Sequence, residues 1–308
     1  METPSPELQQ STRNSKFWFW DFSFKPIVFF IILVVLYNSI TFPFGMLSHF
    51  LSEYVSSSVI LQKSIGLIST VAAIFVSNYF VFVFLKKQLF QQSPAGFSNL
   101  GKELFNGFLT GAAVFSAVIL VSWIIGIYTV TGFYWESHSS FETFSFIAAN
   151  LLFFLAVGLF EEYIFRAGLF HLFEETWGTW VALGFSSLFF GFVHLGNPQA
   201  TLTGAIAITI EAGIFLGAAY LLTRKIWFVV GIHWAWNYFQ GPILGNVISG
   251  SSATQEGLLM SKLDGSDWLT GGIFGPEAGI PAMVICTSVG IYFLAKSYKA
   301  GLFKKSIL

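Results

Sequence analysis

The chain has 308 residues, of which 55% are hydrophobic and only 10% are charged, and its mean hydropathy is +0.70. Soluble globular proteins carry about 25% charged residues, so this composition excludes a soluble domain and predicts an all-α, polytopic integral membrane protein whose partner is the lipid bilayer. The net charge of −1 excludes nucleic acid as a partner. The single cysteine, Cys286, permits no internal disulfide.

Residues 1–25 are rich in Pro, Ser, Gln and Asn, and we expect them to form a flexible cytoplasmic tail. Residues 26–308 are expected to form a single transmembrane domain, because no linker separates two apolar regions. A spanning helix needs about 20 apolar residues, and about eight segments meet or approach that length. These segments are residues 26–48, 60–85, 104–130, 143–170, 179–195, 202–223, 226–248 and 273–295.

The placement of basic residues tests this count independently. With eight spans, twelve of the fifteen Lys and Arg residues fall in the two termini and in the second and sixth connections, which all lie on one side of the membrane. Cytoplasmic connections are the ones enriched in Lys and Arg. The sequence therefore predicts an even number of spans with both termini in the cytoplasm.

The fourth segment carries two adjacent glutamates, Glu161 and Glu162, inside a long apolar run. A charged side chain near the bilayer centre costs at least about 2.5 kcal/mol, so an intramembrane carboxylate indicates a function. Residues four apart share a helical face, which predicts an ion pair between Glu162 and Arg166. Glu161 is offset by about 100° around the helix and has no evident local partner, as suits a general base.

Two later segments bring further polar groups into apolar surroundings. His194 lies near the end of the fifth segment, four residues after Phe190. His233 and Asn237 lie one turn apart on the seventh segment. We expect these side chains to line one cavity within the membrane together with Glu161.

This ordered pattern resembles the three motifs of the CPBP family of intramembrane proteases, which contains the CAAX prenyl endopeptidases and bacterial bacteriocin-processing and self-immunity proteins. The three motifs are Glu161-Glu-x-x-x-Arg166, Phe190-x-x-x-His194 and His233-x-x-x-Asn237. Each motif is weak alone, but the ordered trio on successive apolar segments is specific. The resemblance covers about residues 143–248 and implies a four-helix catalytic core there.

The resemblance implies an intramembrane endopeptidase that cleaves a membrane-associated or prenylated peptide with an activated water. By analogy, Glu161 and His194 activate the water, and His233 and Asn237 stabilise the oxyanion. Glu162 and Arg166 support the site. The cofactor stays open: if a divalent metal such as zinc is bound, the candidate ligands are Glu161, His194 and His233.

Two alternatives from other classes remain at this point. One is a non-proteolytic membrane scaffold or immunity protein that keeps the fold and the motifs. The other is a secondary transporter that uses Glu161 as a proton or ion carboxylate, although the chain has no visible inverted repeat. The expected location is a bacterial plasma membrane, and the substrate and its cleavage site are not specified by the sequence.

Overall fold

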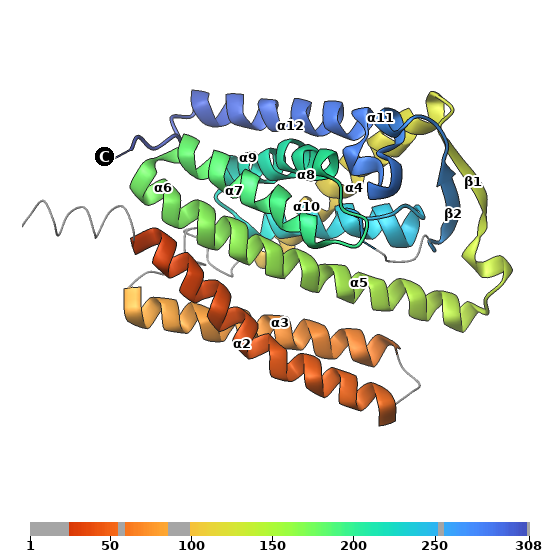
Figure 1. Ribbon diagram of the computed structural model, residues 1–308, viewed down its shortest axis with the longest axis horizontal. Coiled ribbons are helices and arrows are strands. Elements are labelled where there is room, and N and C mark those ends of the chain that lie inside the picture. The colour runs from red at the N-terminus through yellow and green to blue at the C-terminus, as the bar shows by residue number, and fades with distance from the viewer. Residues whose placement is uncertain (1–24, 55–58, 86–98, 252–255, 307–308) are drawn as a thin grey trace, which may run out of the picture.

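The computed structural model describes residues 25–54, 59–85, 99–251 and 256–306, and within them the chain is almost entirely helical (Figure 1). The longer helices are α2 (Lys25–Tyr54), α3 (Val59–Leu85), α4 (Leu100–Ile124), α5 (Ser140–Glu162), α6 (His171–Trp177), α7 (Thr179–Val193), α8 (Leu202–Ile208), α9 (Phe215–Thr223), α10 (Ile226–Tyr238) and α12 (Ile280–Lys299). The prediction of an all-α membrane protein is confirmed. The predicted tail lies outside the described residues, except for Lys25, which opens α2.

Every predicted span coincides with a helical segment, and six helices of the described residues are long and apolar enough to cross a membrane. Several predicted boundaries are wrong: the segments 26–48 and 143–170 extend to Tyr54 and Trp177, and three other boundaries differ because the chain leaves the helix. The segment 104–130 ends as a helix at Ile124, because Gly126 takes a positive φ of 80° and the chain turns into a strand. The segment 226–248 ends at Ile243, and the segment 273–295 becomes α-helical only at Ile280, after two 3₁₀ turns.

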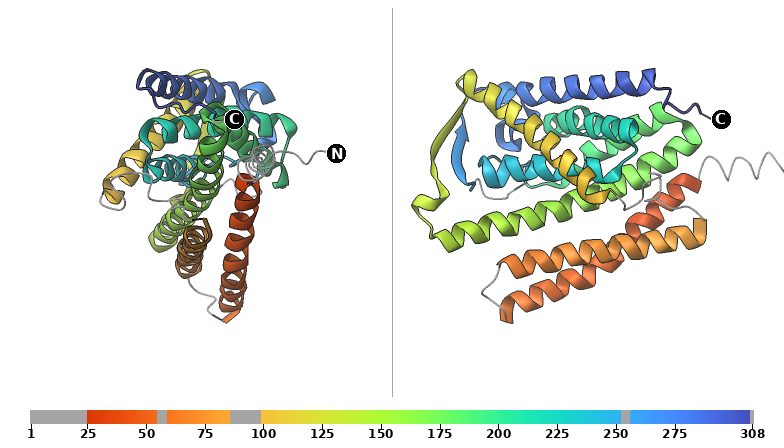
Figure 2. Two further views of the ribbon diagram at one scale, coloured as in Figure 1. Left: turned by 90° about the vertical axis from the view of Figure 1, so that its left-hand side faces the viewer. Right: turned by 180° about the vertical axis from the view of Figure 1, so that it is seen from behind.

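The helices form a bundle in which α5, continued by η3 (Tyr163–Phe170) and α6, runs along the length of the molecule (Figure 1). The hairpin of α2 and α3 lies on one side of this long helix, and the remaining helices lie on the other side (Figure 2). In the span Leu202–Thr223, 72% of an 18-residue apolar stretch is buried, whereas the corresponding share in the other five spans is 22–39%. That span is therefore the centre of the bundle, and the outer helices present apolar side chains to lipid.

Glycine permits a close approach between α4 and α10, the helix that carries the third motif. A Cβ at Gly107 would lie 2.0 Å from the Phe228 carbonyl oxygen, and a Cβ at Gly111 would lie 2.2 Å from that of Ile232. Small residues four apart are a common solution for helix packing in membranes, because they let backbones meet. Since Ile232 directly precedes His233, this contact fixes the position of α10 next to that residue.

Three π-helical turns interrupt the central helices: η3, η5 (Thr209–Ile214) and η6 (Phe239–Ile243). Such wide turns are rare and occur frequently at functional sites. Here η3 begins directly after Glu162, and η6 begins two residues after Asn237. The irregular backbone therefore gathers around the predicted site residues.

The two ends of the bundle differ. At one end, β1 (Tyr128–Phe133) and β2 (Leu259–Leu263) form an antiparallel ribbon next to the short helix α11 (Asp267–Thr270) (Figure 1). At the opposite end, α2 begins and α12 ends (Figure 1). The buried Glu174 carboxylate at this second end binds Arg224 with two contacts of 2.6 and 2.7 Å and lies 3.2 Å from the Lys304 Nζ.

Candidate active site

A cavity of about 550 Å³ lies between the central helices, and the four predicted catalytic side chains all line it. Its walls are mostly apolar, and eight of the lining residues are phenylalanines from α2, α5, η3, α7 and α9, so the polar groups stand out against an apolar lining. The polar lining residues are Glu161, His194, Asn197, Glu211, His233, Asn237, Ser249, Ser251 and Glu277. The sequence motifs thus meet in one apolar-walled cavity, as expected.

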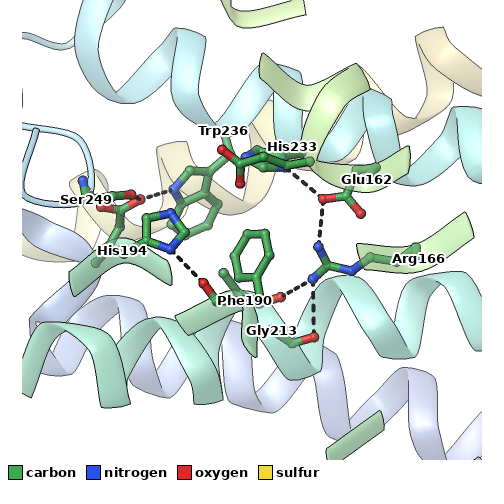
Figure 3. Close-up of polar contacts among 11 residues, drawn as sticks. Glu162, Arg166, Phe190, His194, Gly213, His233, Trp236 and Ser249 are labelled. Carbon is green, nitrogen blue, oxygen red and sulfur yellow. Dashed lines mark hydrogen bonds and ion pairs between the residues drawn. The ribbon is translucent and has the colours of Figure 1, made fainter. Parts of the chain in front are cut away.

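Glu162 connects two of the motifs. Its Oε1 accepts a hydrogen bond of 2.9 Å from the Arg166 guanidinium, which confirms the predicted pair, and both side chains are at most 1% exposed. The same oxygen lies 2.7 Å from His233 Nδ1, a contact that the sequence did not predict (Figure 3). Since a carboxylate oxygen accepts, Nδ1 carries a proton and donates it, which fixes the orientation of the ring. Glu162 therefore orients the third motif as well as stabilising its own helix.

Phe190 explains why the second motif begins with an aromatic residue. The Arg166 Cζ lies over the Phe190 ring, 4.3 Å from the ring centroid, in cation–π geometry. The centroid of the same ring lies 5.9 Å from that of the His233 ring, in a T-shaped arrangement, and 5.2 Å from that of the His194 ring (Figure 3). Phe190 therefore separates the three polar groups and holds their spacing.

His194 lies at the carboxyl end of α7, where its backbone leaves the helix. Its Nδ1 is 2.7 Å from the Phe190 carbonyl oxygen, one helical turn back. A carbonyl oxygen only accepts, so Nδ1 donates the proton and Nε2 keeps a free lone pair. The imidazole is thereby held in the tautomer that can accept a proton through Nε2.

Glu161 is the most exposed carboxylate of the site. Its side chain is 19% exposed, and Oε2 lies 3.9 Å from His233 Nε2. That oxygen has no hydrogen-bond partner among the described residues. Asn237 lies one turn beyond His233 and is 6% exposed on the same cavity wall. Glu161 therefore has acceptor capacity left for a water or a substrate.

Two buried glutamates of the cavity were missed in the sequence. Glu211 is fully buried in η5, and Glu277 is 3% exposed in η8 (Pro276–Ala278). The Glu277 carboxylate accepts hydrogen bonds from the Ser249 backbone and hydroxyl and from the Trp236 indole. A lone Glu inside the apolar span 202–223 is itself a signal of function. That signal could have found Glu211, whereas the position of Glu277 depends on long-range packing.

The predicted metal option does not fit the donor geometry. Zinc sites use at least three protein ligands. No three His, Cys, Asp or Glu side chains within the described ranges lie close enough together to hold a metal ion, and the candidates Glu161, His194 and His233 are no exception. We therefore derive no step through a metal.

Fold and site together define a polytopic helical membrane protein with carboxylates and imidazoles gathered in an apolar-walled cavity. Residues 143–239 match the family described as type II CAAX prenyl endopeptidase Rce1-like. The matched region contains all three motifs, which confirms the resemblance to the CPBP proteases. No curated protein and no solved structure matches the chain.

Proposed function

We propose that this protein is an intramembrane endopeptidase that hydrolyses a membrane-associated or prenylated peptide. The observation that carries the proposal is the meeting of Glu161, His194, His233 and Asn237 in one apolar-walled cavity. Such a cavity strengthens electrostatic interactions and excludes bulk water, so few polar groups suffice to stabilise a charged transition state.

Glu161 and His194 activate the water in this proposal. The free acceptor capacity of Glu161 Oε2 and the lone pair on His194 Nε2 support it, since each can accept a proton. The water oxygen bonds to the scissile carbonyl carbon as its proton passes to Glu161. The same carboxyl then returns the proton to the leaving amine when the C–N bond breaks.

His233 and Asn237 stabilise the oxyanion. The Asn237 amide has two N–H donors, and His233 Nε2 donates when it carries a proton. The bond from His233 Nδ1 to Glu162 supports this role, because it aims Nε2 toward the side of the cavity where Glu161 lies. Preorganised donors of this kind contribute about 10²–10³ in rate each.

The orientation we propose has both termini in the cytoplasm of a bacterial plasma membrane. It is supported by the basic residues Arg224, Lys225 and Lys304, which follow or precede spans at the end of the bundle where α2 begins. Cytoplasmic surfaces of membrane proteins are enriched in such residues.

The test is a mass-spectrometric comparison of new peptide termini in cells that express wild type, Glu161→Gln or His194→Ala at equal membrane levels. Glu103→Gln is the matched control, because Glu103 is also a buried carboxylate but pairs with Lys225 and does not line the cavity. Termini that wild type and the control produce, and that both site variants lack, support proteolysis. Identical termini in all four strains would favour a scaffold, and cation flux in vesicles that depends on Glu161 would favour a transporter.

A further inference from the structure

The cavity contains a second carboxylate group that the proposed chemistry does not use. Glu211 lies in the π-helical turn η5 of the most buried span, and its side chain is 0% exposed. Neither of its carboxyl oxygens has a hydrogen-bond partner in the part of the chain that the structure describes. The Cys286 thiol lies beside it, but a thiol is a weak donor. A buried polar group without a partner is costly and needs an explanation.

The charges on the cavity wall indicate which kind of group fits. Among the residues that the structure describes, three carboxyl groups line the cavity, from Glu161, Glu211 and Glu277, and no Lys or Arg does. Arg166 lies behind the wall with 1% exposure and is already bound to Glu162 and, more weakly, to the carbonyls of η5. The surface offered to a ligand is therefore acidic without a fixed countercharge, and a cationic group is its electrostatic complement.

Glu211 and Glu277, the two glutamates of the cavity wall that the proposed chemistry does not use, differ in how they are held. Glu277 is fixed by three donors, and Ser249, which supplies two of them, also binds Asn197 Nδ2 through its carbonyl oxygen. Its carboxyl group is thus held in a fixed position in the wall. Glu211 has no such donors among the described residues, so both of its oxygens keep unused acceptor capacity. η8, which carries Glu277, packs on α8, directly before the turn that carries Glu211.

We propose that Glu211 and Glu277 form a subsite for the cationic side chain of a lysine or arginine in the substrate peptide. The cation belongs to the segment of peptide that the cavity encloses, close to the scissile bond. An ammonium or guanidinium group supplies three or five donors, which satisfy the free oxygens of Glu211 in a way that an apolar side chain cannot. This inference rests on the proposed function and adds a specificity to it.

The experiment measures binding and cleavage separately. N-terminally palmitoylated peptides of alanine and leucine carry lysine, norleucine or glutamate at each position in turn. Binding is measured on the Glu161→Gln variant in nanodiscs, and cleavage is measured on wild type. At the position that reaches the subsite, we expect lysine to bind and to be cleaved at least about tenfold better than norleucine, because a buried carboxylate loses its only cation in the norleucine complex.

Substitution then tests the residue. In the Glu211→Gln variant, the preference for the lysine peptide over the norleucine peptide, in binding and in cleavage, is expected to fall to a ratio of about one. The control Glu103→Gln is expected to keep the wild-type ratio. If Glu211→Gln does not insert, the wild-type comparison of lysine, norleucine and glutamate still decides the inference.

The outcomes separate the two proposals. Cleavage without any preference for lysine at any position, or a preference that Glu211→Gln leaves intact, overturns the cation subsite but keeps the protease. Tight, lysine-selective binding with no cleavage of any peptide overturns the protease and keeps the cation subsite.

Discussion

Replacing Glu162 by methionine is the most informative perturbation of the core, because this carboxylate binds Arg166 of the first motif and His233 of the third. The change leaves the Arg166 charge buried at 1% exposure, where water cannot replace the lost 2.9 Å contact. What remains for the guanidinium is two carbonyls at 3.4 Å and the Phe190 ring, while its Nε has no partner among the described residues.

The expected loss can be bounded. Removing one partner of a buried ion pair typically costs about 3–5 kcal/mol. The Phe190 contact contributes about 1–2 kcal/mol in such a desolvated setting and survives the change. We therefore expect Glu162→Met to lower the free energy of unfolding by about 3 kcal/mol, which lowers the ratio of folded to unfolded protein by about two orders of magnitude.

The double variant Glu162→Met/Arg166→Met isolates the cause. Replacing a whole buried pair by apolar side chains is often neutral, so we expect the double variant to regain stability to within about 1–2 kcal/mol of wild type. Its activity should stay low, because His233 Nδ1 has lost its acceptor in both variants.

The assay is unfolding of the detergent-solubilised protein with increasing SDS, followed by tryptophan fluorescence, together with cleavage of a substrate found in the proteomic experiment. A double variant as unstable as the single one would refute the reasoning, since the loss would then not arise from a stranded guanidinium. So would a single variant with wild-type stability.

Further predictions address other parts of the molecule. Glu161→Gln should lower kcat by about 10²–10⁴ and leave the unfolding midpoint unchanged, because this side chain is partly exposed and its Oε2 has no hydrogen bond to lose among the described residues; a stability loss would contradict the assignment. Asn237→Ala should lower kcat by about 10²–10³ with little change in KM, and a change in KM alone would instead indicate a substrate contact. Gly111→Leu should destabilise the protein by at least about 1–3 kcal/mol and lower activity as well, because it drives α10 away from α4; normal unfolding would show that the two helices can separate freely. Glu174→Gln should cost about 1–3 kcal/mol through the loss of its contacts to Arg224, yet leave kcat unchanged per folded molecule, as measured by titrating active protein.

Much of the site could be predicted because its key spacings are local. The pairing of Glu162 with Arg166 and the common face of His233 and Asn237 follow from 3.6 residues per turn alone. The helix that carries each motif was identifiable from a continuous apolar run. For these residues the sequence contains the geometry directly.

The remaining contacts join residues that are far apart in the chain. The bond between Glu162 and His233 spans 71 residues, and that between Ser249 and Glu277 spans 28. No local period indicates either pair, because both depend on how helices and loops pack after they have formed. The β1–β2 ribbon was missed for the same reason, since residues 128–133 continue an apolar run that reads as a longer helix.

The segment from Leu302 to Lys304 has a consequence for how the protein can be handled. The Lys304 carbonyl accepts a hydrogen bond from the Thr179 amide, and the Lys304 amide donates to the Thr179 hydroxyl. A helix leaves its first amides without partners, so this stretch serves as the cap of α7. Shortening the chain before Lys304 would uncap the helix whose opposite end carries His194. An affinity tag should therefore be added after the segment from Leu302 to Lys304 and should not replace it. If a shortened variant loses activity, a change in α7 is the first cause to test.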